Sequence, residues 1–310
     1  MKKSIIQKIR SKISSYRKIK EPLTTTENNI KSSFKYFSEL SNKKNIANIN
    51  FSDKKSIIEL YDKRKFFFNP LDGTASKLFS IPITGEFEQK ETDMVGLLLK
   101  KGDTCIDVGA NFGYYSIYMS QKVGSNGYVH AFEPLNHTWN ILQANCILND
   151  IDNIKNNELA LDEVLGEKEI YLPDIGISGS FKLHKYDKAF KKFVIKTTSL
   201  DNYVIENKVE TINFIKADIE GAEFLMIKGA IKSIEKFKPI LFLEIQEHST
   251  VLFGYKPIDI MSYLFRMGYQ VFYVVDKKLV KCDDFIELPD YNFFFIHESK
   301  LKNYANLIFQ

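Results

Sequence analysis

The chain of 310 residues contains little cysteine, glycine or proline. Its three cysteines, Cys105, Cys146 and Cys282, are too few and too scattered for a disulfide framework or a zinc site. Fifteen glycines and eight prolines exclude a collagen-like or low-complexity protein. We therefore expect the cysteines to be small buried side chains in a protein of a reducing compartment.

Long apolar runs are also lacking. The longest, such as Gly96–Leu99, Pro239–Leu243 and Phe293–Ile296, fall far short of the roughly 20 residues that span a bilayer. The five histidines show no spacing typical of metal ligands, so we predict no metal site. With 44% hydrophobic and 26% charged residues, the composition is that of a soluble globular protein, and we expect a cytoplasmic location.

Positive charge is concentrated in the first 20 residues. Residues 1–20 hold eight lysines and arginines and no acid, whereas the rest of the chain holds 39 acidic and 35 basic side chains. Ile6, Ile9, Ile13 and Tyr16 recur at helical spacing within this arm. Such a helix either lies on an anionic membrane surface, at the inner face of a membrane, or packs on its own domain or a partner. The mildly acidic body argues against a nucleic-acid partner.

Three regions are expected along the chain. The basic amphipathic arm, residues 1–20, precedes an N-terminal region, residues 21–85, which we expect to be mostly helical or irregular and to contain Ser56–Tyr61. Residues 86–310 form the main domain, because apolar strand-like runs alternate there with helical patterns. That alternation is typical of right-handed crossovers and a parallel sheet covered on both faces.

The predicted elements of the main domain follow this alternation. The predicted strands are Thr104–Val108, Tyr128–Glu133, Asn157–Leu161, Ile212–Asp218, Ile240–Ile245, Tyr269–Val275 and Tyr291–His297. The predicted helices are Glu86–Lys100, Tyr114–Lys122, His137–Leu148, Glu223–Ile234 and Ile258–Met267. Gly176 and Gly179 break short strand-like pieces within Glu167–Ser199, which suits an antiparallel insertion. The last two strands lack a helix between them, so the final one can insert antiparallel.

The most informative residues follow the first predicted strand of the main domain. Asp107, Gly109 and Gly113 form the pattern D-x-G-x-x-x-G, with Asn111 between the glycines. A dinucleotide site would instead read G-x-G-x-x-G and place a pyrophosphate there, which a neighbouring acid would repel. An acid attracts an ammonium-bearing amino-acid moiety, so the pattern favours S-adenosylmethionine over NAD.

Glu133 supports the same assignment. It ends the next strand, 20 residues beyond Gly113, where a carboxylate can accept hydrogen bonds from both ribose hydroxyls. Its alternative role is that of a solvated strand end before Pro134, which suits the first turn of a helix.

Four motifs together carry a resemblance to a known family. They are GDTCIDVGANFG at 102–113, Phe132–Pro134, KADIEGAE at 216–223 and Leu243–Ile245. Their order and their places at strand ends resemble those of the FkbM family of S-adenosylmethionine-dependent methyltransferases, over about residues 86–275. The resemblance implies a Rossmann-like class I methyltransferase fold of the α/β class, whose seven-stranded, mostly parallel sheet has an antiparallel last strand. Members typically O-methylate sugars or natural products.

Further site residues follow from the motifs. Asp162, before Gly166, resembles the family's acid-then-glycine turn and would accept from the adenine amino group, although a turn-forming aspartate is an equal alternative. A sugar hydroxyl is a poor nucleophile, so a general base would help. The candidate bases at or past the fourth and fifth strands are Asp218, Glu220, Glu223, Glu244, Glu247 and His248. Asp218 is the first choice and His248 the second, because an imidazole can act as a base near neutral pH. Acids at these positions would also stabilise a helix N-terminus.

The sequence leaves several functions open. The leading hypothesis is an O-methyltransferase of a sugar or glycan-precursor hydroxyl. The alternatives are methylation of a lipid, a small natural product or a protein, a non-catalytic scaffold of the same fold, and an NAD-dependent oxidoreductase. Nucleic-acid N-methylation is disfavoured because Asp218–Gly221 stands where a D/N-P-P-Y motif would be needed. Neither the acceptor nor the oligomeric state follows from the sequence.

Overall fold

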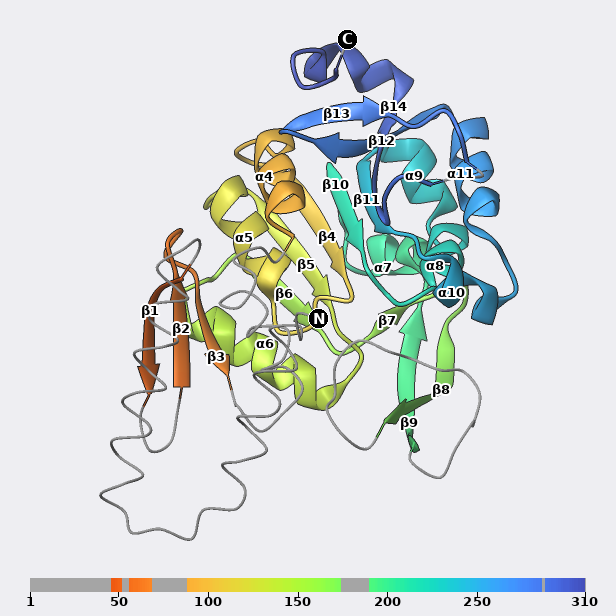
Figure 1. Ribbon diagram of the computed structural model, residues 1–310. Helices are drawn as coiled ribbons and strands as arrows, with labels where there is room; N and C mark the ends of the chain where they lie inside the picture. Colours follow the sequence, from red (N-terminus) through yellow and green to blue (C-terminus); the bar gives the residue numbers. More distant parts are fainter. Residues whose placement is uncertain (1–45, 52–55, 69–87, 174–189, 286–287, 310) are drawn as a thin grey trace, which may run out of the picture.

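The computed structural model describes residues 46–51, 56–68, 88–173, 190–285 and 288–309. The basic arm, and Gly176 and Gly179 of the expected insertion, lie outside these ranges. The largest element is an eight-stranded sheet with helices on both faces (Figure 1). None of the helices in the described ranges is both long and apolar enough to cross a bilayer.

The order of the parallel strands across the sheet reverses at one point. From one edge to the other the strands are β13 (Lys278–Lys281), β12 (Tyr269–Val275), β14 (Asn292–His297), β11 (Ile240–Glu244), β10 (Phe214–Ala217), β4 (Thr104–Val108), β5 (Tyr128–Phe132) and β6 (Ile154–Asn157). Five neighbouring strands from β6 to β11 run parallel, and β14 is antiparallel to both of its neighbours. The order reverses between β4 and β10. In open α/β sheets, the carboxyl ends of strands at such a switch point are where ligands bind.

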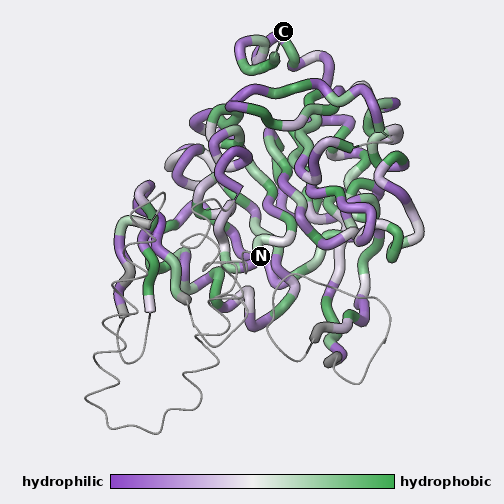
Figure 2. Tube along the Cα trace, viewed as in Figure 1, coloured by the Kyte–Doolittle hydropathy of each residue, from purple (hydrophilic) through white to green (hydrophobic). Residues whose placement is uncertain are grey.

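Helices cover the two faces and create two apolar cores. One face carries α4 (Gln89–Leu98), α5 (Tyr114–Val123) and α6 (Asn136–Leu148). The other carries α7 (Leu200–Glu206), α8 (Glu223–Lys228), α9 (Ile231–Phe237) and α11 (Pro257–Arg266). Because the central strands are buried on both faces, they read as continuous apolar runs, which Figure 2 shows as hydrophobic tube inside the molecule. The predicted antiparallel last strand is confirmed.

Two predicted elements of the main domain are wrong. The single helix predicted over Glu223–Ile234 is broken into α8 and α9, because a Cβ at Gly229 would lie 2.0 Å from the backbone oxygen of Asp162. The close approach of this distant backbone fixes the break. The third parallel strand is β6, earlier than the predicted Asn157–Leu161.

A small three-stranded sheet stands where an insertion was expected. Its order is β7 (Ala160–Leu161), β9 (Phe190–Thr198) and β8 (Gly166–Pro173), and β8 and β9 pair antiparallel. Ile170 and Ile195 are buried together with Leu135 beneath this ribbon. The antiparallel character predicted for this insertion is therefore confirmed in its described part.

The described part of the N-terminal region is a second small sheet, which corrects the helical prediction for it. The strands β1 (Ile46–Phe51), β2 (Ser56–Leu60) and β3 (Lys65–Phe68) form an antiparallel meander. Ile58 and Leu60 alternate inward along β2, as in a strand with one buried face, and Phe66 of β3 is fully buried. Figure 1 shows this sheet beside α6.

Candidate functional site

A buried lysine lies between two acids at the carboxyl ends of the central strands. Asp107 of β4 and Lys216 of β10 are directly paired in the parallel register, and Asp218 follows two residues later on the same face of the sheet. Lys216 Nζ lies 3.8 Å from Asp107 Oδ1 and 3.5 Å from Asp218 Oδ2. Ser116 Oγ on α5 donates to Asp107 Oδ2 over 2.5 Å. The sequence analysis placed both acids but missed Lys216, whose signal is a lysine within an apolar strand.

The charges in this triad support one another. Asp107 is 0% exposed and Lys216 only 4% exposed, so neither would stay charged without a partner. Burial raises the pKa of Asp107, against the lowering effect of Lys216 and Ser116. Burial alone would lower the pKa of Lys216, but the charges of the neighbouring acids, Asp218 and Asp107 foremost and then Glu88 and Glu244, together raise it. The ring of Tyr115 lies 5.3 Å from the ammonium.

The turn after β4 has glycines where other parts of the protein approach it closely, backbone at Gly109 and a leucine side chain at Gly113. Gly109 has a φ of +74°, and a Cβ there would lie 2.1 Å from the backbone oxygen of Asp218. Gly113 has a φ of +97°, and its Cβ would lie 2.6 Å from Leu142 Cδ1. The structure shows that they let the turn pack against β10 and α6.

Glu133 is a buried acid held by the same turn. The backbone N–H of Asn111 donates to its Oε2 over 3.0 Å, and that of Leu135 donates to its Oε1 over 3.0 Å. The side chain is 4% exposed, and burial raises its pKa to about 7. Each carboxylate oxygen can accept a second hydrogen bond, so Glu133 can still receive two hydroxyl donors.

Asp218 and Glu244 form a pair of carboxyl groups next to Lys216. The register Ala217 with Leu243 places these acids side by side at the ends of β10 and β11. They are hydrogen-bonded to each other, and burial together with the charge of Asp218 raises the pKa of Glu244. Two carboxyl groups in such contact favour sharing one proton. Gln246 Nε2 also donates to Glu244 Oε1 over 2.7 Å.

Glu88 is a further acid at this site that the sequence analysis missed. It lies just before α4, and burial and the charge of Asp218 raise its pKa. No motif distinguishes it, because it is remote in sequence from the four motif segments.

Glu223 has a structural position. Its Oε1 accepts from the backbone N–H groups of Ile219 (2.9 Å) and Gly221 (3.3 Å), so it closes the turn between β10 and α8. Burial raises its pKa to about 7. The Tyr255 hydroxyl donates to the Gly221 backbone oxygen and secures the same turn.

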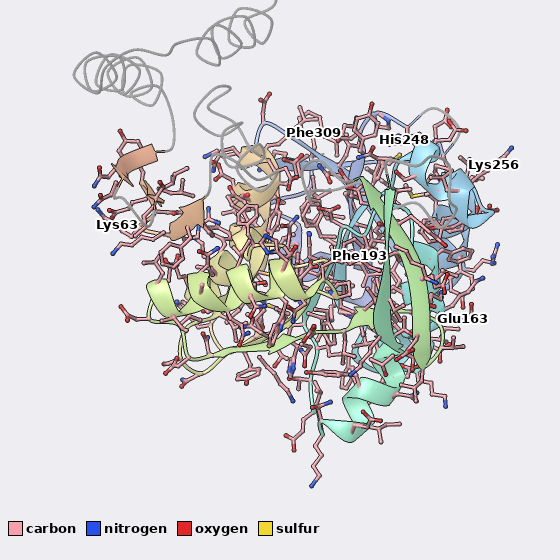
Figure 3. All side chains as sticks on the ribbon, turned by 90° about the horizontal axis from the view of Figure 1, so that it is seen from below. Lys63, Glu163, Phe193, His248, Lys256 and Phe309 are labelled. Carbon is pink, nitrogen blue, oxygen red and sulfur yellow. The ribbon has the colours of Figure 1, made fainter. Side chains whose placement is uncertain are left out.

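Two predicted site residues lie apart from the triad. His248 is exposed on α10 (Glu247–Thr250), and Figure 3 shows it at the periphery, on the same side as Lys256. Asp162 is buried, accepts the Glu163 N–H over 2.6 Å and pairs with Lys168 Nζ at 2.5 Å. These bonds fit the turn-forming alternative for Asp162, and its contact with adenine stays a prediction.

The site fits the predicted donor. A buried acid stands at the end of each of the first two parallel strands, with a tight glycine turn between them, and Glu133 keeps acceptor capacity for ribose hydroxyls. Among the described residues, no three His, Cys, Asp or Glu side chains are grouped so as to hold a metal ion. The strand order, with its antiparallel β14, and this glycine turn define a class I S-adenosylmethionine-dependent methyltransferase. S-adenosylmethionine is the cofactor of this class.

The chain belongs to the FkbM family. The family model described as "Methyltransferase FkbM domain" matches residues 107–271, more than half of the chain. The chain is similar to the "Hexuronic acid methyltransferase AglP" of Haloferax volcanii, with 27% identity over 56% of this chain and 67% of that protein. It is also 26% identical to the "Methyltransferase sdnD" of Sordaria araneosa over 40% of this chain, and the match spans 59% of that relative.

Solved structures that align with this one include methyltransferases from bacteria. An FkbM methyltransferase from Methylobacillus flagellatus aligns with a TM-score of 0.43 and 20% identity, covering 72% of this chain and 53% of that one. An S-adenosylmethionine-dependent O-methyltransferase from Thermotoga maritima aligns with a TM-score of 0.39 and 15% identity, covering 78% and 77%.

Proposed function

We propose that this chain transfers the methyl group of S-adenosylmethionine to a hydroxyl of a sugar or glycan precursor. The observation that carries the proposal is the carboxyl pair of Asp218 and Glu244, which lies at the switch point beside Lys216. This pair is next to the glycine turn of residues 109–113, between Asp107 and Glu133, which we call the cofactor turn. A sugar hydroxyl needs a proton acceptor, and this pair offers one. The name of the relative AglP supports a sugar-type acceptor.

The residues divide into those that hold the donor and those that serve the acceptor. The bound donor supplies an electrophilic methyl group on a sulfonium, which needs no covalent help from the protein. Glu133 would accept the ribose hydroxyls, and Asp107 would attract the ammonium of the amino-acid moiety. Asn111, Gly109 and Gly113 shape the turn between them.

Asp218 is the group that we propose as proton acceptor. When the donor methylates the acceptor hydroxyl, Asp218 would take up the proton that this hydroxyl releases. The Asp218 side chain is 26% exposed, so an acceptor can approach it, whereas Asp107 is sealed in the protein. Lys216 lies against the carboxylates of Asp107 and Asp218 and offsets their negative charge.

His248 stays a second prediction for the base. It lies beyond β11 in an exposed short helix, and the described contacts do not connect it with the Lys216 triad. Acceptors other than sugars, namely a lipid or a small natural product, fit the same chemistry, since the donor side is common to all of them. A non-catalytic scaffold is the alternative from a different class. A cytoplasmic location and contact of residues 1–20 with a membrane are also proposals.

The first experiment is titration calorimetry of the full chain with S-adenosylhomocysteine and, separately, with NADH. We expect the wild type to bind S-adenosylhomocysteine and not NADH, and the variants Asp107→Ala and Glu133→Gln to bind it weakly or not at all. His248→Ala is the matched control, because this exposed residue is outside the cofactor turn and should leave binding unchanged. A wild-type chain that does not bind S-adenosylhomocysteine would contradict the proposal and favour the scaffold.

The acceptor is tested with S-adenosylmethionine carrying a labelled methyl group. Neutral hexosides, hexuronic acids, long-chain alcohols and phenolic natural products are offered in parallel. Label recovered as a base-stable ether on a sugar supports the proposal. Label found only on a lipid or phenol, or as a base-labile ester, would replace the proposed acceptor class.

A further inference from the structure

The β1–β3 sheet lies outside the family match at residues 107–271 and packs against the cofactor turn. Its third strand, β3, runs beside α6, and the β2–β3 turn meets the start of α5 (Figure 1). Three independent sets of contacts join this sheet to residues 112–114, which end the glycine turn and begin α5.

Two asparagines, Asn145 in the last turn of α6 and Asn149 at its C-cap, take the place of a partner strand for β3. Asn145 Oδ1 accepts from the Phe67 N–H over 2.8 Å, and Asn149 Oδ1 accepts from the Lys65 N–H over 2.8 Å. Asn149 Nδ2 donates back to the Lys65 carbonyl over 2.7 Å. Asn145 Nδ2 instead donates to the carbonyl of Phe112 over 2.8 Å. Asn145 is therefore a bridge between β3 and Phe112, whereas Asn149 Nδ2 donates to the Lys65 and Asn145 carbonyls and not to residues 112–114.

Aromatic packing makes the second connection. The ring of Phe66 meets the ring of Phe112 edge-on, with centroids 5.5 Å apart, and lies 6.1 Å from the ring of Tyr114. Phe66 and Phe112 are both fully or almost fully buried. Phe66 of β3 therefore contacts the ring of Phe112, and Asn145 of α6, which also binds β3, holds its carbonyl.

Arg64, in the turn between β2 and β3, makes the third connection. Its guanidinium is 2% exposed and donates from Nη1 to the carbonyl of Tyr114 over 2.7 Å. It lies 4.2 Å from the ring centroid of Tyr114 and 4.8 Å from that of Tyr118. Asp62 balances its charge through an ion pair of 2.8 Å. This geometry needs a planar fork that also stacks, which arginine supplies and lysine does not.

We propose that the β1–β3 sheet is a positioning element for the cofactor, which holds Asn111–Tyr114 in the conformation that accepts S-adenosylmethionine. Asn111 belongs to this segment, and its N–H is one of the two backbone groups that orient Glu133. Release of Phe112 would therefore reach Glu133 through a single residue. The inference rests on the proposed use of this site for S-adenosylmethionine.

The expected size of the effect follows from population arithmetic. Asn145 Nδ2 makes a buried hydrogen bond, and its loss frees the Phe112 carbonyl. If the turn then keeps its binding conformation about one-tenth of the time, the apparent affinity falls about tenfold.

Asn145→Asp and Asn149→Asp make a matched test in the full chain. Each aspartate keeps the oxygen that accepts from β3 and loses the N–H donor, and each adds one negative charge. We expect Asn145→Asp to bind S-adenosylhomocysteine about tenfold more weakly than the wild type by calorimetry. Asn149→Asp should lower Tm comparably and leave the Kd within about twofold, because its donor does not reach the turn. Asn145→Ala, which adds no charge, should repeat the loss of affinity.

Arg64→Lys gives a second arm that does not depend on α6. It should weaken binding of S-adenosylhomocysteine while a buried cation is retained. Equal Kd values for wild type, Asn145→Asp and Asn145→Ala would overturn the inference, and so would an equal loss in Asn149→Asp. A wild type that does not bind S-adenosylhomocysteine would overturn the proposed function instead, so the two failures are distinct.

Discussion

Individual carboxyl groups in the site differ in what holds them. Glu133 and Glu223 each receive two backbone N–H groups, Asp107 receives Ser116 and Lys216, and Asp218 shares a hydrogen bond with Glu244. The first three are fixed by the protein itself. Glu133 and Glu223 would lose backbone contacts on protonation, and Asp107 is sealed in the protein, whereas the Asp218 side chain is 26% exposed, which is why we place the chemistry at the pair.

Asp218→Asn tests this placement. The amide has the same shape but cannot accept the hydroxyl proton, so kcat should fall by about 10²–10⁴-fold, the usual contribution of a general base. The Kd for S-adenosylhomocysteine should change by less than about threefold, because the donor is held by Asp107 and Glu133. Turnover with labelled donor and calorimetry give the two values. His248→Ala is the comparison, and a large loss of kcat there with full activity in Asp218→Asn would move the base to His248.

Glu133 should make cofactor binding depend on pH. Its pKa is raised to about 7, and its ionised form makes the stronger hydrogen bonds to hydroxyls. Affinity for S-adenosylhomocysteine should therefore rise as pH increases through about 7 and level off above it. The pH series is read by calorimetry in buffers of matched ionic strength. Glu133→Gln should flatten it, whereas Glu223→Gln, which removes another acid with a pKa of about 7, should not.

Sequence reasoning located the acids that end strands but not the residues that become neighbours through the fold. Asp107, Glu133 and Asp218 are recognisable because strand ends and glycines mark them. Lys216 and Glu88 have no such local signal. Lys216 reaches the site through the register of β4 with β10, and Glu88 through the position of α4 over the sheet.

Several glycines lie where the backbone of one element comes into close contact with the backbone of another. Gly109 packs against β10, and Gly229 packs against the backbone of Asp162. The predicted Glu223–Ile234 helix failed for this reason: helical periodicity is local, whereas the break is imposed by a residue almost 70 positions away. The strands of residues 46–68 were missed because their buried face is completed by α6 rather than by a pattern within the segment.

Gly109→Ala and Gly102→Ala separate steric contact from backbone strain. Both glycines have a positive φ, +74° and +87°, but a Cβ at Gly102 meets nothing within 4 Å. Gly102→Ala should lower the free energy of unfolding by about 1–2 kcal/mol through strain alone. Gly109→Ala should lower it by a further ~1–3 kcal/mol, because Asp218 must move. Denaturant titration measures both changes. Equal losses would mean that the contact with Asp218 is relieved easily.

At the scale of the whole molecule, several buried acids bind a proton more readily in the folded state than in the unfolded state. Burial raises the pKa values of Glu133 and Glu223 to about 7 from an ordinary value of 4.5, and raises that of Glu244 as well. Because the folded state then binds more protons than the unfolded state, their contribution to stability is complete below pH 4.5. It is lost as pH rises to about 7, and Glu244 extends the loss to higher pH.

Stability without cofactor should consequently fall between about pH 5 and pH 8. The raised pKa of Lys216 adds nothing in this range, since lysine is charged in both states there. Thermal unfolding of the wild type and of a Glu133→Gln, Glu223→Gln double variant, measured across this pH range, tests the expected fall in stability. The double variant should have the shallower dependence of Tm on pH, and an identical slope would contradict this account.

The place of β14 determines when the sheet can be completed. This strand, the last in chain order among the described strands, lies between β11 and β12, and its first residue, Asn292, pairs with Glu244. During translation, β12 therefore has no route to the rest of the sheet until residues 292–297 have left the ribosome. The edge of β11 that includes Glu244 also stays open until then. A nascent chain can therefore form the turn after β4 and the β10–β11 pairing before β12 joins the sheet.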